Sequence, residues 1–283
     1  MIIVGVDGSV ASRAAVEWAA NDACRMHLPL RIVHAVDHSP YQIARFPNDD
    51  WPDALVRAGQ RFLAEAVALA HERQPEVEVT TEVVEGPAAV VLREQSKEAT
   101  EVVVGSRGLG GFAGALLGSV SVHVAGQTRC PVVVVRGERR ATVGEVAVGV
   151  DDSPECEPAL AYAFEQARLR GSTLRTVHAW QLPVHAFAPD LPYDLDEVRK
   201  EQHQLVTARL EPFKEKYPQV TVVEDVQSAH PVNALTQASE KADLLVVGSH
   251  GRGAMGSVLL GSVSRGVLHH ARCPVAVVRA ADE

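Results

Sequence analysis

The stretch GSRGLGGFAGALLGSV, residues 105–120, returns as GSHGRGAMGSVLLGSV at residues 248–263. Both copies follow the pattern G-x2-G-x9-G-S, so the glycine spacing is the same in each. Glycine lets the backbone approach a ligand without interference from a Cβ atom and permits positive φ at a sharp turn. The repeated track therefore predicts two similar sites that expose backbone amides.

The similarity between the two halves extends over nearly the whole chain. Aligning residues 102–136 with residues 245–279 gives 20 identities in 35 positions. A chain of 283 residues has the length of two domains. We expect these domains at residues 1–137 and 145–283, joined by a polar linker. The other repeated pairs are IIVGVDGS (2–9) with VAVGVDDS (146–153), LRIVHAV (30–36) with LRTVHAW (174–180), and RCPVVVVR (129–136) with RCPVAVVR (272–279).

Short β-branched apolar runs alternate with longer helical patterns in each half, which is typical of βαβ units and a parallel sheet. Runs such as VVVV and LLVV are continuous, as expected of strands that helices cover on both faces. Each half is therefore predicted to be a doubly wound α/β domain. The expected strands are residues 2–6, 30–36, 77–84, 101–105 and 131–136, then 145–150, 173–179, 219–226, 243–248 and 274–279.

The helices of the first half are expected between these strands. The first follows DGS, with Ser9 or Asp7 as the candidate cap, and runs to about Met26. The second and third are expected at about residues 54–73 and 87–98. The fourth is expected to begin near residue 118, at the Gly-Ser pair that closes the track.

Composition and charge exclude several classes of protein. The formal net charge of -9 argues against a surface built to bind nucleic acid or anionic lipid. No apolar run is long enough for a membrane span, and the first residues lack the features of a signal peptide, so we expect a cytoplasmic protein. The four cysteines are scattered without CxxC spacing, which predicts reduced thiols rather than disulfides or a zinc site.

Each track begins where a buried strand ends and finishes where a helix should begin. This places it at the carboxyl edge of the sheet, where open α/β folds bind ligands. A Gly-Ser pair at a helix start offers free amides, the positive end of the helix dipole and serine hydroxyls, all of which suit phosphate oxygens. The alternative is that the glycines only form turns and the serine only caps a helix; two intact copies favour phosphate.

Other glycine motifs fit less well. GRGAMG (251–256) matches GxGxxG, but it follows the fourth strand rather than the first, and no acidic residue stands about twenty positions later. A P-loop is excluded because neither track contains GK[ST]. Phosphate charge must therefore be met by backbone amides, arginine and metal.

These residues resemble the universal stress protein family, in its ATP-binding branch and tandem two-domain form. The resemblance covers almost the whole chain; it is carried by the G-x2-G-x9-G-S track, by GVDGS and GVDDS, by VHAV and VHAW, and by RCPV. It implies a five-stranded parallel sheet in the order 3-2-1-4-5 with helices on both faces. It also implies one ATP per domain between the ends of the first and fourth strands, with Mg²⁺ held through the ATP phosphates and no direct protein ligand to the metal.

The resemblance assigns ATP contacts to matching positions in both halves. Asp7 and Asp151 are expected on the ribose or adenine side; their alternative role is turn formation. Ala35 and Ala179 offer backbone groups to an adenine edge. The full set is Gly5, Val6, Asp7, Ala35, Gly105, Ser106, Arg107, Gly108, Gly118, Ser119, Val120 and Ser121, then Gly149, Val150, Asp151, Ala179, Gly248, Ser249, His250, Gly251, Arg252, Gly261, Ser262, Val263 and Ser264.

Cations differ between the two predicted sites. Arg107 and His250 share one slot in the track, and a neutral histidine would give the second site less positive charge unless Arg252 compensates. His34 and His178 also repeat, and we interpret them as packed and hydrogen-bonded residues rather than catalytic ones.

A non-catalytic ATP-binding module in stress regulation is the preferred interpretation. The alternative is an enzyme, either a slow ATPase or a nucleotidyl transferase, but no positioned base appears near either track. The resemblance further suggests a homodimer and a regulatory protein partner of unknown identity. The apolar edges VVVVR and VAVVR give a physical reason for assembly, because exposed sheet edges tend to be covered.

Overall fold

The computed structural model describes residues 1–37, 51–109, 117–136, 141–181, 195–251 and 260–280. The chain forms two compact units: Met1–Ala141 with Pro274–Ala281 is the first, and Thr142–Cys273 is the second. The last strand of the second repeat thus belongs to the first compact unit. Among these described residues, no helix is both long and apolar enough to cross a membrane.

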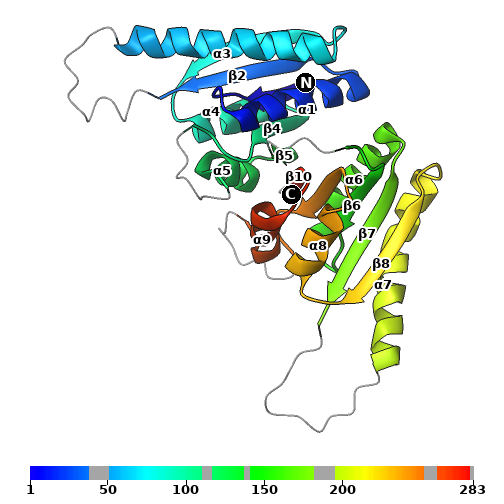
Figure 1. Cartoon of the computed structure of the whole chain (residues 1–283). Coiled ribbons are helices and arrows are strands. Elements are labelled where there is room, and N and C mark those ends of the chain that lie inside the picture. The colour runs from blue at the N-terminus through cyan, green and yellow to red at the C-terminus, as the bar shows by residue number, and fades with distance from the viewer. Residues whose placement is uncertain (38–50, 110–116, 137–140, 182–194, 252–259, 281–283) are drawn as a thin grey trace, which may run out of the picture. The chain divides into compact units, whose positions relative to one another are not determined.

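Strands and helices alternate in both halves as predicted (Figure 1). The first half contains β1 (Ile2–Gly5), α1 (Val10–Met26), β2 (Leu30–Val36), α3 (Trp51–Arg73), β3 (Val79–Glu85), α4 (Ala88–Gln95), the 3-10 helix η1 (Ser96–Glu98), β4 (Glu101–Gly105), α5 (Ser119–Gln127) and β5 (Val132–Val135). The second half contains β6 (Glu145–Gly149), α6 (Cys156–Arg170), β7 (Thr173–Trp180), α7 (Leu195–Lys216), β8 (Val222–Ser228), α8 (Pro231–Ser239), β9 (Leu244–Gly248), α9 (Ser262–His270) and β10 (Val275–Val278).

The third strand of each half begins two or three residues later than the sequence predicts. Val77 is not yet in the strand because its N–H donates to the carbonyl of Gln74 in a turn. Val220 does the same with the carbonyl of Tyr217. Both apolar residues therefore close the preceding helix–strand turn, a role that periodicity cannot distinguish from a strand start.

The strand order confirms the predicted topology. It is β3-β2-β1-β4-β5 in the first half and β8-β7-β6-β9-β10 in the second. β1 pairs in parallel with both β2 and β4, and β6 pairs in parallel with both β7 and β9. The direction of the connections therefore reverses between β1 and β4 and again between β6 and β9, where open α/β sheets form ligand crevices.

The central strands form the core of each sheet. Val102 and Val103 of β4 are fully buried, as are Leu244 and Leu245 of β9. In the first half α1 packs with α3, and α4 packs with α5, so both faces of the sheet are covered. Burying each such side chain stabilises the fold by about 1.5–3 kcal/mol, which makes the sheet a stable platform for the loops at its carboxyl edge.

The strand β10 pairs in antiparallel with β5 in the first unit. Val275 lies opposite Val134, and Val277 lies opposite Val132. The two apolar edges from which the sequence predicts assembly are thus paired with each other within one chain. Unpaired apolar edges therefore no longer give a physical reason for a homodimer, and the homodimer stays a prediction.

Candidate functional site

A cavity lies at the carboxyl edge of the first sheet, where the sequence predicts the ligand. Its volume is about 270 Å³. It includes every proposed first-half residue except Ser106, which is buried. The lining consists of Gly5, Val6, Asp7, Ser12, Val33, Ala35, Ala88, Leu92, Val104, Gly105, Arg107, Gly108, Gly118, Ser119, Val120 and Ser121.

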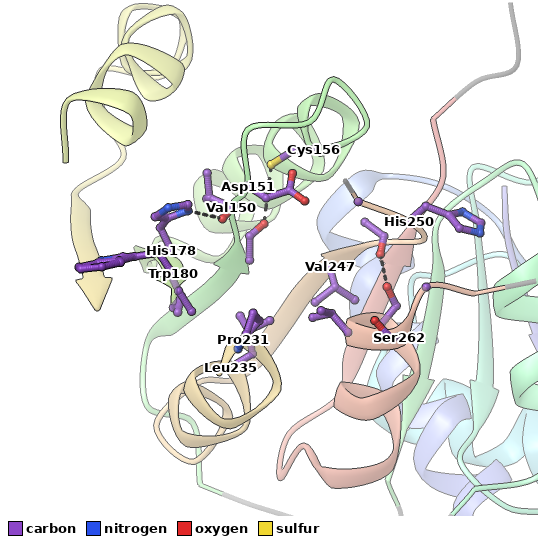
Figure 2. A pocket seen from close by; sticks show the side chains of 18 of the residues that line it. Val150, Asp151, Cys156, His178, Trp180, Pro231, Leu235, Val247, His250 and Ser262 are labelled. Atoms are coloured by element: carbon purple, nitrogen blue, oxygen red, sulfur yellow. Dashed lines mark hydrogen bonds between the residues drawn. The ribbon is translucent and has the colours of Figure 1, made fainter. Parts of the chain in front are cut away.

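The second unit has the corresponding cavity, which is larger, with a volume of about 720 Å³ (Figure 2). The proposed residues that line it are Gly149, Val150, Asp151, Ala179, Gly248, His250, Gly251, Gly261, Ser262, Val263 and Ser264. Ser249 is buried away from the lining. Arg252 lies outside the described residues.

The helices α5 and α9 begin at these cavities with free backbone amides. Their N-cap residues, Gly118 and Gly261, are extended, and neither helix has a side-chain cap. Such amides, together with the positive end of the helix dipole, form an anion-binding site. Within the described part of the chain, no acceptor pairs with the N–H groups of Ser119, Val120 and Ser121 in α5 or of Ser262, Val263 and Ser264 in α9.

The serine hydroxyls at these helix starts play two different roles. Ser121 donates its hydroxyl proton to the carbonyl oxygen of Gly105 at 2.7 Å, and Ser264 donates to that of Gly248 at 2.6 Å. Both serines are buried. Their hydroxyls fasten the helix to the end of the strand, which corrects the expectation that they donate to phosphate.

Ser119 and Ser262 occupy the first helical position, and both are exposed. Their hydroxyls make no hydrogen bond within the described residues. These two hydroxyls therefore keep the donor capacity that the sequence predicts for phosphate.

Asp7 and Asp151 hold the loop after the first strand of each half. Asp7 accepts hydrogen bonds from the N–H of Ser9 at 3.0 Å and from the N–H of Leu109, in the glycine track, at 2.9 Å. Asp151 accepts from the N–H of Ser153 at 3.0 Å. The turn-forming role is present for both residues, and their contact with ribose or adenine stays a prediction.

The second glycine of each track is required by these carboxylates. A Cβ atom at Gly108 would lie 2.4 Å from Oδ2 of Asp7, and one at Gly251 would lie 2.4 Å from Oδ2 of Asp151. Any side chain at either glycine would displace the carboxylate. The two units are identical in this respect.

The first glycine of the track has a different neighbour from the one the sequence predicts. A Cβ atom at Gly105 would lie 2.7 Å from the carbonyl carbon of Ala11, in the backbone of α1. At Gly248 the nearest atom would be the carbonyl oxygen of His250, at 3.0 Å. The close approach of α1 therefore requires glycine at position 105, and the predicted contact of its backbone with phosphate stays a prediction.

The cationic slot of the track opens onto both cavities. Arg107 lines the first cavity and is exposed, whereas His250 lines the second and is half-buried. Nδ1 of His250 lies 3.1 Å from Oγ of Ser249. Among the residues that the structure describes, no group of three or more His, Cys, Asp or Glu side chains is placed to hold a metal ion.

Each cavity also has an apolar lining residue that the sequence does not indicate. These residues are Leu92 of α4 and Leu235 of α8. A Cβ atom at Gly5 would lie 2.8 Å from Leu92, and one at Gly149 would lie 3.2 Å from Leu235. Both leucines are the fifth residue of the helix after the third strand, and this repetition is the signal that could have revealed them.

Cys156, the first residue of α6, lines the second cavity (Figure 2). Its thiol donates to the carbonyl oxygen of Gly149 at 3.8 Å. Burial raises the pKa of this thiol to about 11, so it is protonated at neutral pH. Ser12 lines the first cavity at the corresponding position.

Comparison with known proteins fits this architecture. The model of the universal stress protein family matches residues 1–136 and again residues 143–279. Universal stress protein Rv2005c of Mycobacterium tuberculosis is 39% identical over 289 residues, which cover 98% of this chain and 96% of that protein. Universal stress protein Rv2623 of the same organism is 36% identical with the same coverage.

A solved structure supports the fold over the full length. The crystal structure of a universal stress protein from Archaeoglobus fulgidus aligns with a TM-score of 0.72 and 21% identity, covering 99% of this chain and 97% of that one. The two repeats, their strand order and the match to the family model therefore all indicate the same fold. The chain belongs to the universal stress protein family, in its tandem two-domain form.

Proposed function

We propose that each unit binds one ATP at the carboxyl edge of its sheet, with the phosphates on the amides that open α5 and α9. One observation carries the proposal: two uncapped helix N-termini, each with three unpaired amides, open into cavities at the topological switch points. Unpaired amides at a helix start are donors that suit phosphate oxygens.

The rest of each cavity suits a nucleoside. Ala35 and Ala179 lie at the ends of β2 and β7 and line the cavities, so their backbone groups are available to a base. Leu92 and Leu235 supply apolar surface to the lining. Ligand sites of this kind combine mostly apolar walls with a few placed polar groups.

In this proposal Mg²⁺ is held by the ATP phosphates and not by a protein side chain. Mg²⁺ bound to ATP would offset part of the phosphate charge, and the exposed Ser119 and Ser262 lie at the end that would hold the phosphates. Arg107 adds a permanent positive charge at the first site.

We propose a regulatory binding module rather than a fast enzyme. Rapid phosphoryl transfer needs a positioned base or water-orienting group beside the phosphates. Both carboxylate oxygens of Asp7 already accept hydrogen bonds from loop amides, and Oδ1 of Asp151 accepts from Ser153. These carboxylates are therefore engaged in holding the loops.

The test is direct. Mass spectrometry of ligand released from freshly purified protein should find ATP, and added ATP should raise the melting temperature whereas NAD should not. At a concentration of 100 times Kd, binding stabilises a folded unit by about 2.7 kcal/mol. Absence of released nucleotide together with an unchanged melting temperature contradicts binding, and turnover on the order of 1 per second contradicts the regulatory reading.

A further inference from the structure

The two cavities differ in how closely the long helix after the second strand approaches them. In the first unit α3 lies directly against His34 of β2, because a Cβ atom at Gly59 would be 2.4 Å from Cδ2 of that ring. Phe62, three residues further along α3, packs edge-on against the same ring, with 5.5 Å between ring centroids. No described residue of α3 lines the first cavity.

In the second unit a polar side chain replaces that bare helix backbone. Gln202 of α7 lies with Oε1 2.9 Å from Nε2 of His178, the counterpart of His34. The other ring nitrogen of His178, Nδ1, lies 2.8 Å from the carbonyl oxygen of Val150 (Figure 2). Gln202 and Val198 bring α7 into the lining of the second cavity.

The position of the proton on His178 determines which end of the Gln202 carboxamide faces Nε2. The carbonyl oxygen of Val150 can only accept, so Nδ1 carries a proton, and in a neutral imidazole Nε2 then needs a donor. The two ends of a carboxamide have the same shape, so a half-turn places the NH₂ group of Gln202 on Nε2 without moving another atom. The carboxamide oxygen of Gln202 is left as an acceptor on a side chain that lines the cavity.

We infer that Gln202 selects the base at the second site by accepting a hydrogen bond from an amino group on a purine. The inference rests on the proposed nucleotide binding. In the sheet order β7-β6-β9, phosphates at α9 put the base on the β7 side, where Gln202 lies. Adenine carries an amino group at position 6, whereas hypoxanthine carries an oxygen there, and two facing acceptors leave a polar group unpaired.

The first unit has no described counterpart of this acceptor, because α3 presents Gly59 to His34 instead. Among the described residues, selection against a 6-oxo purine by this route is therefore possible at the second site and not at the first. The two sites of one chain differ in ligand selectivity, although their phosphate ends match.

Calorimetric titration of the full chain with ATP and with inosine triphosphate tests the inference. All proteins carry Ser119→Asp, which places a carboxylate at the start of α5 and silences the first site. Gln202→Leu should weaken ATP binding about 3- to 10-fold and leave inosine triphosphate within about twofold. Gln204→Leu, the same change at an exposed position of the same helix, should alter neither.

Equal weakening of both triphosphates in a folded Gln202→Leu protein overturns the inference, and so does an unchanged ATP affinity. Gln202→Met serves as a second variant of similar length if the leucine variant melts early. Equal affinity of the unaltered second site for the two triphosphates also overturns it, whatever the variants do. Absence of binding by either triphosphate instead overturns the nucleotide proposal, on which this inference depends.

Discussion

The two cavities are similar where α5 and α9 begin and differ on the side of β2 and β7. In both units an uncapped helix start faces the cavity, and the second glycine of the track lies equally close to an aspartate. The cavity volumes nevertheless differ, at about 270 Å³ in the first unit and about 720 Å³ in the second. The two units thus share the main-chain features of the candidate site and differ in the side chains that line it.

The two units also differ in how their long helix contacts the second strand. α7 meets β7 through Gln202 and His178, whereas α3 meets β2 through Gly59 and His34. Trp180, at the end of β7, also lines the second cavity. Main-chain donors depend on backbone geometry, which two similar folds share, while side-chain packing changes with each substitution.

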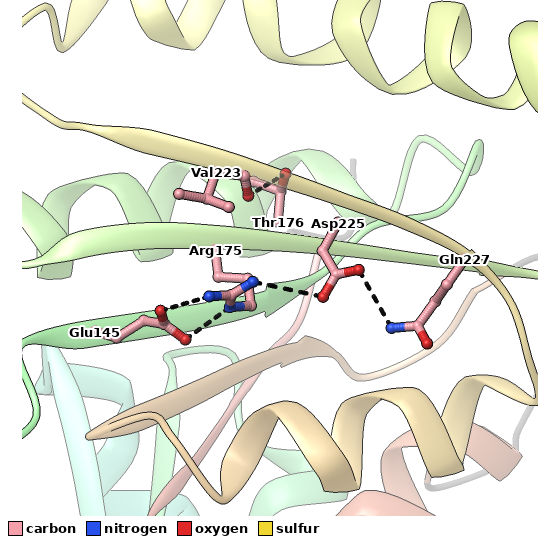
Figure 3. Close-up of polar contacts among 6 residues, drawn as sticks. All are labelled: Glu145, Arg175, Thr176, Val223, Asp225 and Gln227. Atoms are coloured by element: carbon pink, nitrogen blue, oxygen red, sulfur yellow. Dashed lines mark hydrogen bonds and ion pairs between the residues drawn. The ribbon is translucent and has the colours of Figure 1, made fainter.

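Away from the cavity, strands β6, β7 and β8 of the second unit carry a polar network (Figure 3). Arg175 of β7 binds Glu145 through two nitrogens, at 2.8 and 2.9 Å, and lies 3.6 Å from Asp225 of β8. The ion pairs raise the pKa of Arg175, with the hydrogen bond to Glu145 as the largest cause. This network ties β6, β7 and β8 together beneath the second site.

The largest effect is expected from a carboxylate at the helix starts. Ser119→Asp and Ser262→Asp place a negative charge beside the unpaired amides, where it stabilises the helix by about 0.3–1 kcal/mol but repels phosphate. Because juxtaposed like charges cost several kcal/mol, ATP binding at the altered site should fall on the order of 100-fold. Equilibrium dialysis should count one ATP in each single variant and none in the double variant.

A double variant that still binds two ATP molecules with the affinity of the unaltered chain would contradict phosphate binding at the two helix starts. Ser119→Ala and Ser262→Ala are the matched controls, since they remove the hydroxyl without adding charge. They should retain most of the binding, because the amides remain.

Protection of Cys156 from alkylation reports whether a ligand occupies the second cavity, independently of the first. With a pKa of about 11, its alkylation should be slow at pH 8 and should accelerate about tenfold per pH unit up to about pH 11, as the thiolate fraction rises. Saturating ATP should slow the reaction roughly tenfold, because the ligand would cover the thiol. Peptide mass spectrometry measures both rates.

Cys130 is the control, since burial raises its pKa to about 11 as well and it lines neither cavity. ATP should not change its alkylation rate. Ser12→Cys moves the probe into the first cavity and should become ATP-protected there. Equal rates for Cys156 with and without ATP contradict a ligand in the second cavity.

A smaller effect, on stability, should separate the first glycines of the two tracks. Gly105→Ala forces a methyl group to within 2.7 Å of the α1 backbone, whereas Gly248→Ala meets a carbonyl oxygen at 3.0 Å. The first substitution should cost about 1–3 kcal/mol by overpacking and the second less. Urea denaturation of both variants gives the order, and the reverse order contradicts the packing account of Gly105.

The smallest effect is expected at the N-cap glycines, where the two units should behave alike. A Cβ atom at Gly118 would have its nearest neighbour at 3.5 Å, and one at Gly261 at 3.4 Å, so alanine fits at both. Each variant should lose no more than about 1 kcal/mol, the usual cost of alanine at an N-cap. A much larger loss in one unit only would show that the two helix starts are not equivalent.

Much of this architecture can be predicted from the sequence because it depends on repetition and periodicity. The strand order agrees with the structure, and nearly all residues proposed to contact ATP line the two cavities, although their contact with ATP stays a prediction. Ser9 is the cap of α1, as one of the two predicted candidates, and accepts from the N–H of Ser12. His34 and His178 are hydrogen-bonded to carbonyl oxygens, as packed histidines are expected to be.

The remaining features depend on directions that a sequence does not encode. The sequence does not distinguish Ser119 from Ser121. In the structure Ser119 is exposed, whereas the hydroxyl of Ser121 donates to the carbonyl oxygen of Gly105. Gly105 lines the cavity, but only the structure shows that its missing Cβ would point at α1. Gln202 lies in a helix without an obvious motif, and only the fold brings it to His178.

The central claim is that main-chain amides at two helix starts hold the triphosphate. The most direct measurement is a backbone amide NMR spectrum of the full chain titrated with ATP and Mg²⁺. The account predicts large shifts for the amides of Ser119, Val120 and Ser121 and for those of Ser262, Val263 and Ser264. ATP binding that leaves these six resonances unmoved would contradict it.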